Sequence, residues 1–241
     1  MKRFGIKIRV ASLALVLVFS YLMVYYTLEN VDVYIPTSAA VQDEFIIILD
    51  AGHGGMDGGC SSPDGILEKD VNLSILLSVR DLCKVLGYNV EATRETDISI
   101  HDKGIEGPGP QKRSDMENRL ALFNKYSNAL CISIHQNKFT QPSAWGAQMF
   151  YSDTNPANEG IARIMQSKFV EYLQPDNTRE IKLSSKELYL CYFCDNPTVM
   201  VECGFLSNPE ESAKLRTADY QKQVAFTIFS GINEYVKQNI T

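Results

Sequence analysis

From about residue 45 onward, the chain alternates short apolar runs with amphipathic segments. Continuous runs such as FIIILD (45–50) and ALCISIH (129–135) are typical of strands that are buried on both faces of a sheet. Between them, residues 71–86 place apolar side chains at helical spacing, and Gly87 follows as a helix C-cap. This alternation predicts an α/β fold with a largely parallel sheet and helices on both faces.

The same patterns predict the remaining elements of the domain. Apolar runs predict strands at 88–94, 144–151, 188–193 and 198–202. Helical spacing or capping residues predict helices at about 116–126, after 155, after 208 and at about 217–238. The segment HDKGIEGPGPQKRSD (101–115) is rich in Gly, Pro and charge, so it is predicted to be a polar loop.

The first 26 residues differ in character from the rest of the chain. Positions 1–9 hold four basic residues and no acid, and a nearly unbroken apolar run follows at 10–26. This order predicts a signal peptide or a membrane anchor, with the bulk of the protein outside the cytoplasm. The run lies between the usual lengths of the two, and the small residues at 38–40 lie far beyond it. An uncleaved anchor is therefore favoured, and late cleavage stays open.

Composition and charge fit an exported globular protein. With 45% hydrophobic and 22% charged residues, the chain is neither disordered nor collagen-like. Residues 27–44 show no periodicity and predict a linker to one catalytic domain at 45–241. The formal net charge is -6, and removing the four basic residues of 1–26 leaves 19 basic against 29 acidic residues, or -10. This balance argues against nucleic acid as a partner and leaves membrane contact to residues 10–26.

Candidate chemistry follows the ends of the predicted strands. His53 comes just after the first strand, His135 ends the third, and Glu202 ends the run TVMVE. In a largely parallel sheet, the binding crevice forms beyond these carboxyl ends. Glu68 starts the helix that follows the first strand, so two imidazoles and one carboxylate form the His₂Glu donor set of a catalytic zinc site. Glu202 is then free to serve as the general base.

The segment DAGHGGMDGG (50–59) surrounds His53 with glycines, which leaves room above the imidazole for a metal and a substrate. It lacks the Gly-Lys-Ser/Thr of a phosphate loop, and Asp57 replaces the third glycine of a dinucleotide fingerprint. Simpler interpretations stay open for single residues: a strand-end His can be structural, and Glu68 can be a helix-dipole partner. His101 is predicted to be a solvated loop residue.

The pair Cys191 and Cys194 forms a C-x-x-C motif. Such a motif can be a redox pair or half of a metal site. No second pair completes a four-cysteine site, and the surrounding segment is apolar. Packing as small hydrophobic residues is therefore favoured over a disulfide.

Several motifs occur together in a fixed order: DAGHGGMDGG, Glu68 in LEKDVNL, TRETD (93–97), NRLALFN (118–124), SIHQN (133–137) and NPTVMVECGFLSNPEE (196–211). Between about 45 and 237 the chain resembles the zinc-dependent N-acetylmuramoyl-L-alanine amidases of the AmiC-like (Amidase_3) type. The resemblance implies a twisted mixed sheet, zinc bound by His53, Glu68 and His135, and Glu202 as the catalytic glutamate. It also implies hydrolysis of the amide between the lactyl group of N-acetylmuramic acid and L-alanine in peptidoglycan.

Within the family, one catalytic domain behind a short N-terminal segment most resembles the germination-specific (CwlD) type of spore formers. That type removes stem peptides so that muramic-δ-lactam can form in spore cortex. A vegetative autolysin or cell-separation amidase, another peptidoglycan zinc peptidase and a silent wall-binding module remain alternatives. An acidic domain without a wall-binding repeat also predicts an accessory extracytoplasmic protein that helps it to meet the glycan strand.

Two departures from the family pattern predict local differences. Gln136 stands where the family often has alanine, which predicts a narrower cleft. The stretch 97–119 is longer than usual and predicts a flap.

Overall fold

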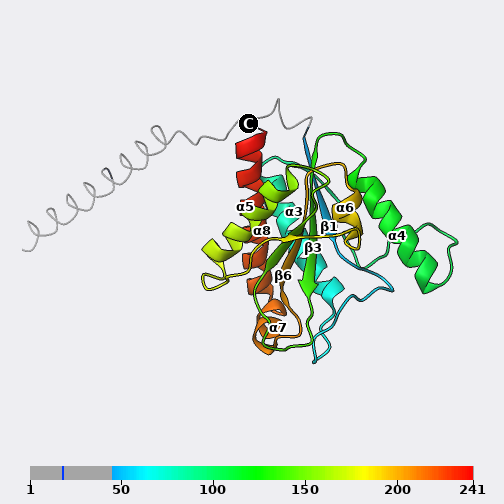
Figure 1. Ribbon diagram of the computed structural model, residues 1–241, viewed down its shortest axis with the longest axis horizontal. Helices are drawn as coiled ribbons and strands as arrows, with labels where there is room; N and C mark the ends of the chain where they lie inside the picture. Colours follow the sequence, from blue (N-terminus) through cyan, green and yellow to red (C-terminus); the bar gives the residue numbers. More distant parts are fainter. Residues whose placement is uncertain (1–17, 19–44, 241) are drawn as a thin grey trace, which may run out of the picture. The chain divides into compact units, whose positions relative to one another are not determined.

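The computed structural model describes Val18 and residues 45–240, in which a six-stranded sheet forms the centre (Figure 1). The strands are β1 (Ile46–Ala51), β2 (Asn89–Ala92), β3 (Ala129–Asn137), β4 (Gln148–Tyr151), β5 (Lys182–Leu183) and β6 (Thr198–Phe205). Their order is β2-β1-β3-β6-β4-β5, and every pairing is parallel except that of β4 with β6. The predicted mixed, largely parallel sheet is confirmed.

Six helices in the described residues cover both faces of the sheet (Figure 1). They are α3 (Glu68–Val85), α4 (Pro108–Phe123), α5 (Asn158–Tyr172), α6 (Tyr189–Phe193), α7 (Pro209–Leu215) and α8 (Ala218–Asn239). Helices α3 and α5 both pack on α8 and on the strands behind them, whereas α4 and α6 contact each other and the opposite face. The expectation of helices on both faces is confirmed.

Strand β1 shows why its sequence is continuously apolar. Successive side chains of a strand point to opposite faces of the sheet. Ile47 and Leu49 therefore enter the larger core beneath α3, α5 and α8, while Ile48 enters a smaller core with Phe123 of α4. All four side chains are fully buried. A polar residue at any of these strand positions would lose its contact with water on whichever face it entered.

Two predicted elements are wrong, and the predicted strand at 144–151 shortens to β4. The run 188–193 forms helix α6 rather than a strand. An apolar run of this length cannot distinguish the two, and a single helical turn is enough to bury Leu190 and Cys191 in the smaller core. Helix α4 begins at Pro108, well before the predicted start, because proline is tolerated in the first turn, where backbone N–H groups have no helical partner.

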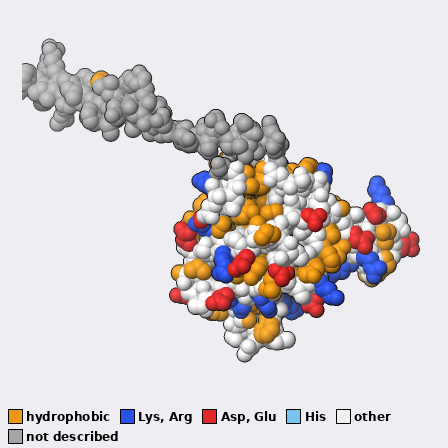
Figure 2. Space-filling view, turned by 45° about the horizontal axis from the view of Figure 1, so that its top comes forward, with side chains coloured by type: hydrophobic (Ala, Val, Ile, Leu, Met, Phe, Trp, Pro, Cys, Tyr) orange, Lys and Arg blue, Asp and Glu red, His pale blue; other side chains and the backbone are white. Residues whose placement is uncertain are grey.

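The predicted signal or anchor at 1–26 and the linker at 27–44 lie outside the described residues, apart from Val18. Among the residues that are described, no helix combines the length and the apolar character needed to cross a bilayer. The face of the domain drawn in Figure 2 carries acidic and basic side chains that are interspersed, rather than one broad basic surface. That distribution agrees with the acidic composition of the chain.

Candidate functional site

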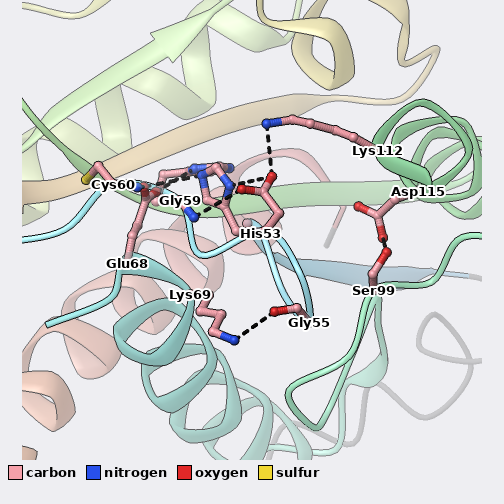
Figure 3. Close-up of polar contacts among 12 residues, drawn as sticks. His53, Gly55, Gly59, Cys60, Glu68, Lys69, Ser99, Lys112 and Asp115 are labelled. Carbon is pink, nitrogen blue, oxygen red and sulfur yellow. Dashed lines mark hydrogen bonds and ion pairs between the residues drawn. The ribbon is translucent and has the colours of Figure 1, made fainter. Parts of the chain in front are cut away.

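His53, Glu68 and His135 converge beyond the carboxyl ends of β1 and β3. Figure 3 shows His53 and Glu68 side by side at this place. His53 Nε2 lies 3.3 Å from Glu68 Oε2, and His135 Nδ1 lies 2.9 Å from Glu68 Oε1. One potential ligand atom from each residue lies within 4.8 Å of the others. Three residues far apart in the sequence thus form one cluster, because β1 and β3 are neighbours and α3 starts beside them.

The backbone around His53 is strained. His53 has a φ of 64°, in the left-handed region that residues with a Cβ seldom adopt, and Gly54 follows with a φ of 135°. Two arginines hold this turn by its carbonyl oxygens. Arg119 donates to the carbonyls of Ala51 at 2.8 Å and of His53 at 2.7 Å. Arg94 also donates to Ala51 O, at 3.0 Å. Such strain persists only where the surroundings fix the backbone, as these bonds do.

Glycines leave the space that the two imidazoles occupy. A Cβ atom on Gly52 would lie 2.1 Å from Cε1 of His135. A Cβ atom on Gly59 would lie 2.6 Å from Oε2 of Glu68 and 2.7 Å from Cδ2 of His53. All three distances are far below van der Waals contact, so an added side chain would displace the members of the cluster.

Asp57 lies behind His53 and was not predicted as a site residue. Its carboxylate is 3.0 Å from His53 Nδ1 and 2.9 Å from Nζ of Lys112, on α4. Burial alone would raise the pKa of Asp57, but the hydrogen bonds from His53 and Lys112 outweigh it and lower that pKa to about 2. A carboxylate on Nδ1 orients the ring and directs Nε2 toward the cluster. The available clue was its position four residues after His53.

Glu68 is buried and accepts hydrogen bonds on both carboxylate oxygens. Besides the two histidines, the backbone N–H of Cys60 donates to Oε2 at 2.8 Å and that of Gln136 to Oε1 at 3.1 Å. Burial by itself raises the pKa of Glu68, but the hydrogen bonds from His135 and His53 outweigh it and hold the pKa well below its usual range. The ionised carboxylate gives the cluster a negative charge that favours a cation.

Glu202 lies on β6 directly beside His135, which is its register partner on β3. In-register residues of neighbouring strands project from the same face, so the carboxylate of Glu202 is on the side of the cluster. Its Oε2 atom is buried and has no hydrogen-bond partner in the described part of the chain. Burial raises the pKa of Glu202 to about 7, against the opposing effect of His135.

The structure also settles three smaller expectations. Gln136 does not narrow the cleft: its side chain is buried and its amide donates to Asn72 Oδ1 at 3.1 Å. His101 lies away from the cluster, and its Nδ1 is 2.9 Å from Ser99 Oγ. All six cysteines are free, as packing predicted, and Cys194 contacts Cys131, with the two sulfur atoms 3.9 Å apart.

The stretch 97–119, expected to be a flap, packs against the loop that carries His53. Asp97 accepts a hydrogen bond from the backbone N–H of Gly55 at 2.8 Å and pairs with Lys69 at 2.7 Å. Lys112, in the first turns of α4, reaches Asp57. The stretch is therefore not a free flap: it packs against the loop that carries His53 and helps to hold that loop in place.

The residues present fit a zinc ion. Two imidazoles and a carboxylate are the donor types of hydrolytic zinc sites, and here they lie close enough to contact a single ion. Gly52 and Gly59 leave room for the two imidazole rings. Glu202, whose Oε2 atom lacks a hydrogen-bond partner in the described part of the chain, lies beside His135. A closed structural site would have four protein ligands, whereas this cluster has three.

Comparison with known proteins agrees with this geometry. The profile of the family Amidase_3, N-acetylmuramoyl-L-alanine amidase, matches residues 47–234. The germination-specific N-acetylmuramoyl-L-alanine amidase of Bacillus subtilis is 37% identical over 210 residues, which cover 87% of each chain.

Two solved structures show the same fold. The CwlD amidase from Clostridioides difficile, solved in complex with the GerS lipoprotein, superposes with a TM-score of 0.77 and 34% identity, covering 80% of this chain and 99% of that one. An N-acetylmuramoyl-L-alanine amidase from Clostridium difficile 630 superposes with a TM-score of 0.70 and 28% identity, covering 81% of this chain and 98% of that one.

Proposed function

The chain belongs to the N-acetylmuramoyl-L-alanine amidase family, and from this premise we propose that it hydrolyses the amide between the lactyl group of N-acetylmuramic acid and L-alanine in peptidoglycan. The observation that carries this proposal is the convergence of His53, Glu68 and His135 next to Glu202, whose Oε2 atom has no hydrogen-bond partner among residues 45–240. Because that arrangement has three metal ligands and a separate base, it supports hydrolysis rather than passive binding.

In the proposed mechanism, His53, Glu68 and His135 would hold the zinc ion. When bound, the ion would supply Lewis-acid chemistry for the scissile carbonyl and for the attacking water. Asp57 holds the ring of His53 through Nδ1, so that Nε2 keeps its direction during the reaction. Arg119 keeps the strained turn at His53 from relaxing.

Glu202 carries the proton in this proposal. Its carboxylate takes a proton from the attacking water and gives it to the nitrogen of L-alanine as the amide bond breaks. Burial raises the pKa of Glu202 in the metal-free protein. A carboxylate that takes up a proton and then releases it can serve first as base and then as acid.

Amidases of this kind act on peptidoglycan outside the cytoplasm. We extend this to the chain as follows: residues 1–26 export it or anchor it to the outer face of the membrane, 27–44 form a linker, and 45–241 form the catalytic domain. Similarity to the germination-specific amidase supports a role in spore cortex, as a step toward muramic-δ-lactam. The CwlD amidase was solved with a lipoprotein, which supports an accessory extracytoplasmic protein here as well.

The test is mass spectrometry of muropeptides after incubation with the purified protein and zinc. Hydrolysis of the lactyl amide releases peptides with a free N-terminal L-alanine, whereas a zinc peptidase leaves that amide intact and shortens the peptide instead. The Glu202→Gln variant is the matched control, because it keeps the shape of the side chain and removes the base. Products that retain the lactyl amide would contradict the proposed reaction.

The cortex role has its own test in the producing organism. Loss of the gene should remove muramic-δ-lactam from spore cortex, and the Glu202→Gln allele should fail to restore it. Normal lactam content in that strain would favour the vegetative alternative.

A further inference from the structure

A groove of about 460 Å³ lies next to the proposed catalytic centre, along β4 and β5. Asn137, two residues after His135, lines one end, and Lys182 of β5 lines the other. Arg179 and the ring of Phe205 also line it. The groove thus begins at the strands that carry the cluster and runs toward the edge of the sheet.

A row of paired positions connects the groove to the catalytic centre. His135 on β3 pairs in register with Glu202 on β6, and Glu202 pairs with Gln148 on β4. These three residues project from one face of the sheet, because directly paired residues share a face. Neighbouring strands lie about 4.8 Å apart, so Gln148 is about 10 Å from His135. Arg179 continues the row, since its Nη1 donates to Gln148 Oε1 at 3.2 Å.

The guanidinium of Arg179 is held in a fixed position. Its Nε donates to the carbonyl of Trp145 at 2.6 Å, and its Cζ lies 4.6 Å from the ring centroid of Phe205. A guanidinium that is already held in position loses little side-chain entropy when it forms a bidentate ion pair with a carboxylate.

Among the described residues, no carboxylate forms an ion pair with Arg179 or Lys182, whereas Lys69, Lys112 and Arg119 each have such a partner. Glu211 is the acid whose pKa Arg179 influences, but its carboxylate accepts hydrogen bonds from the backbone N–H groups of Phe205 and Gly146, at 2.8 and 3.1 Å. The described lining of the groove therefore holds two cations and no carboxylate, in a chain whose net charge is -6.

From this we propose that the groove is the subsite for the peptide portion of the substrate, with Arg179 as a specificity-determining residue that pairs with a free carboxylate. Lys182 adds charge at the far end. An extended peptide spans about 3.5 Å per residue, so a carboxylate two or three residues beyond the scissile amide would reach Arg179. This inference rests on the proposed function for the identity of the bond that is cut, and it adds the residue that recognises a free carboxylate of the peptide.

The kinetic test compares two substrates on the full-length protein: an N-acetylmuramoyl tetrapeptide with free carboxylates and the same compound with its carboxylates converted to carboxamides. The wild type should cleave the acidic substrate with a kcat/KM about tenfold higher, as one charged hydrogen-bonded contact predicts. Arg179→Met should lower kcat/KM about tenfold on the acidic substrate, mainly through KM, and leave the carboxamide substrate unchanged. Arg179→Lys should recover part of the loss.

The matched control is Arg163→Met, because Arg163 lies on α5 and pairs with Glu159 outside the groove. This variant should cleave both substrates like the wild type. If the wild type cleaves both substrates equally well, or if Arg179→Met lowers both to the same extent, Arg179 is a structural residue and the inference is overturned.

A binding titration separates this inference from the proposed reaction. Glu202→Gln protein is titrated with the free acidic tetrapeptide and with its carboxamide form, so no hydrolysis is needed. The acidic peptide should bind about tenfold more tightly, and the added Arg179→Met change should abolish the difference. Equal affinity for the two peptides overturns the subsite even if hydrolysis occurs, whereas a clear preference without lactyl-amide cleavage supports the subsite and contradicts the proposed reaction.

Discussion

Arg119 connects the stability of the fold with the geometry of the site, and replacing it with methionine tests both. Its side chain is 1% exposed, so it is buried almost completely. Nη1 contacts Oδ1 of Asp50 at 2.5 Å, Nε contacts Oδ2 of Asp115 at 2.7 Å, and Nη2 donates to the carbonyl of His53. Methionine fills much of the same space but makes none of these contacts.

The expected loss of stability follows from Asp50. This carboxylate is fully buried at the end of β1, with Ser133 and Thr93 as further hydrogen-bond donors at 2.7 and 2.8 Å. Removing one partner of a buried ion pair typically costs about 3–5 kcal/mol, because the other charge stays buried without compensation. Since two hydroxyl groups still serve Asp50, we expect a loss near the lower end, about 3 kcal/mol.

The pH dependence has a defined sign. Burial alone raises the pKa of Asp50, but the charge of Arg119 leads the effects that outweigh it, so the pKa in the wild type is lowered from 3.8. The ionised carboxylate therefore stabilises the wild type above the ordinary pKa of aspartate, and that stability is lost as the pH falls through the lowered value. Without Arg119, burial dominates and the pKa of Asp50 rises. The difference between the proteins should thus be largest near pH 7 and narrow in acid.

The assay is urea unfolding of the wild type and of Arg119→Met, followed by circular dichroism at several pH values. Arg163→Met is the control, because its exposed pair with Glu159 should contribute less than about 1 kcal/mol. Zinc affinity should fall in Arg119→Met as well, since the carbonyl of His53 loses its donor. A loss of stability below about 1 kcal/mol at pH 7, or one that grows in acid, would refute this account of the Asp50–Arg119 pair.

Three further outcomes concern the site itself. His53→Ala should lower zinc content well below the roughly one ion per chain expected for the wild type, as metal analysis would show; equal zinc in both would remove the proposed ligand. Glu202→Gln should retain zinc but lower kcat by about a hundredfold or more in muropeptide assays, and wild-type turnover would exclude it as the base. Gly52→Ala should reduce both zinc binding and activity because its Cβ would clash with His135, whereas Gly160→Ala, a helical site with open space around it, should be stable and active. Thermal unfolding and turnover of the two variants should be measured side by side. Equal losses in both would mean that replacing any glycine with alanine has this effect, and that the clash with His135 is not the cause.

Much of the sheet was predictable because the strands are buried on both faces. Strand β1 is buried on both faces, so Ile47, Ile48 and Leu49 are all apolar, and this continuous run predicts a central strand. The candidate site residues could also be identified from the sequence. His53 and His135 follow or end strands that pair in parallel, and the carboxyl ends of such strands meet at one edge of the sheet. The convergence of ligand atoms within 4.8 Å is a property of the fold.

Local patterns failed where packing made the decision. The run 188–193 has the composition of a strand, yet it forms α6, because one short helical turn covers the smaller core beside α4. Helix α4 buries few side chains, so its first half shows no apolar periodicity, and the sequence predicts a loop there.

The sequence by itself determined the layered α/β architecture and predicted the residues that we propose bind zinc and move a proton. Only the tertiary structure decided how those residues are supported. No periodic pattern of apolar residues marks Asp57 as a partner of His53. Arg119 donates to the carbonyl of His53, 66 positions away, and Arg179 donates to the carbonyl of Trp145, 34 positions away. The physical reason is that burial of apolar side chains follows the period of a strand or helix, whereas a polar side chain acts through partners that the folded chain brings beside it.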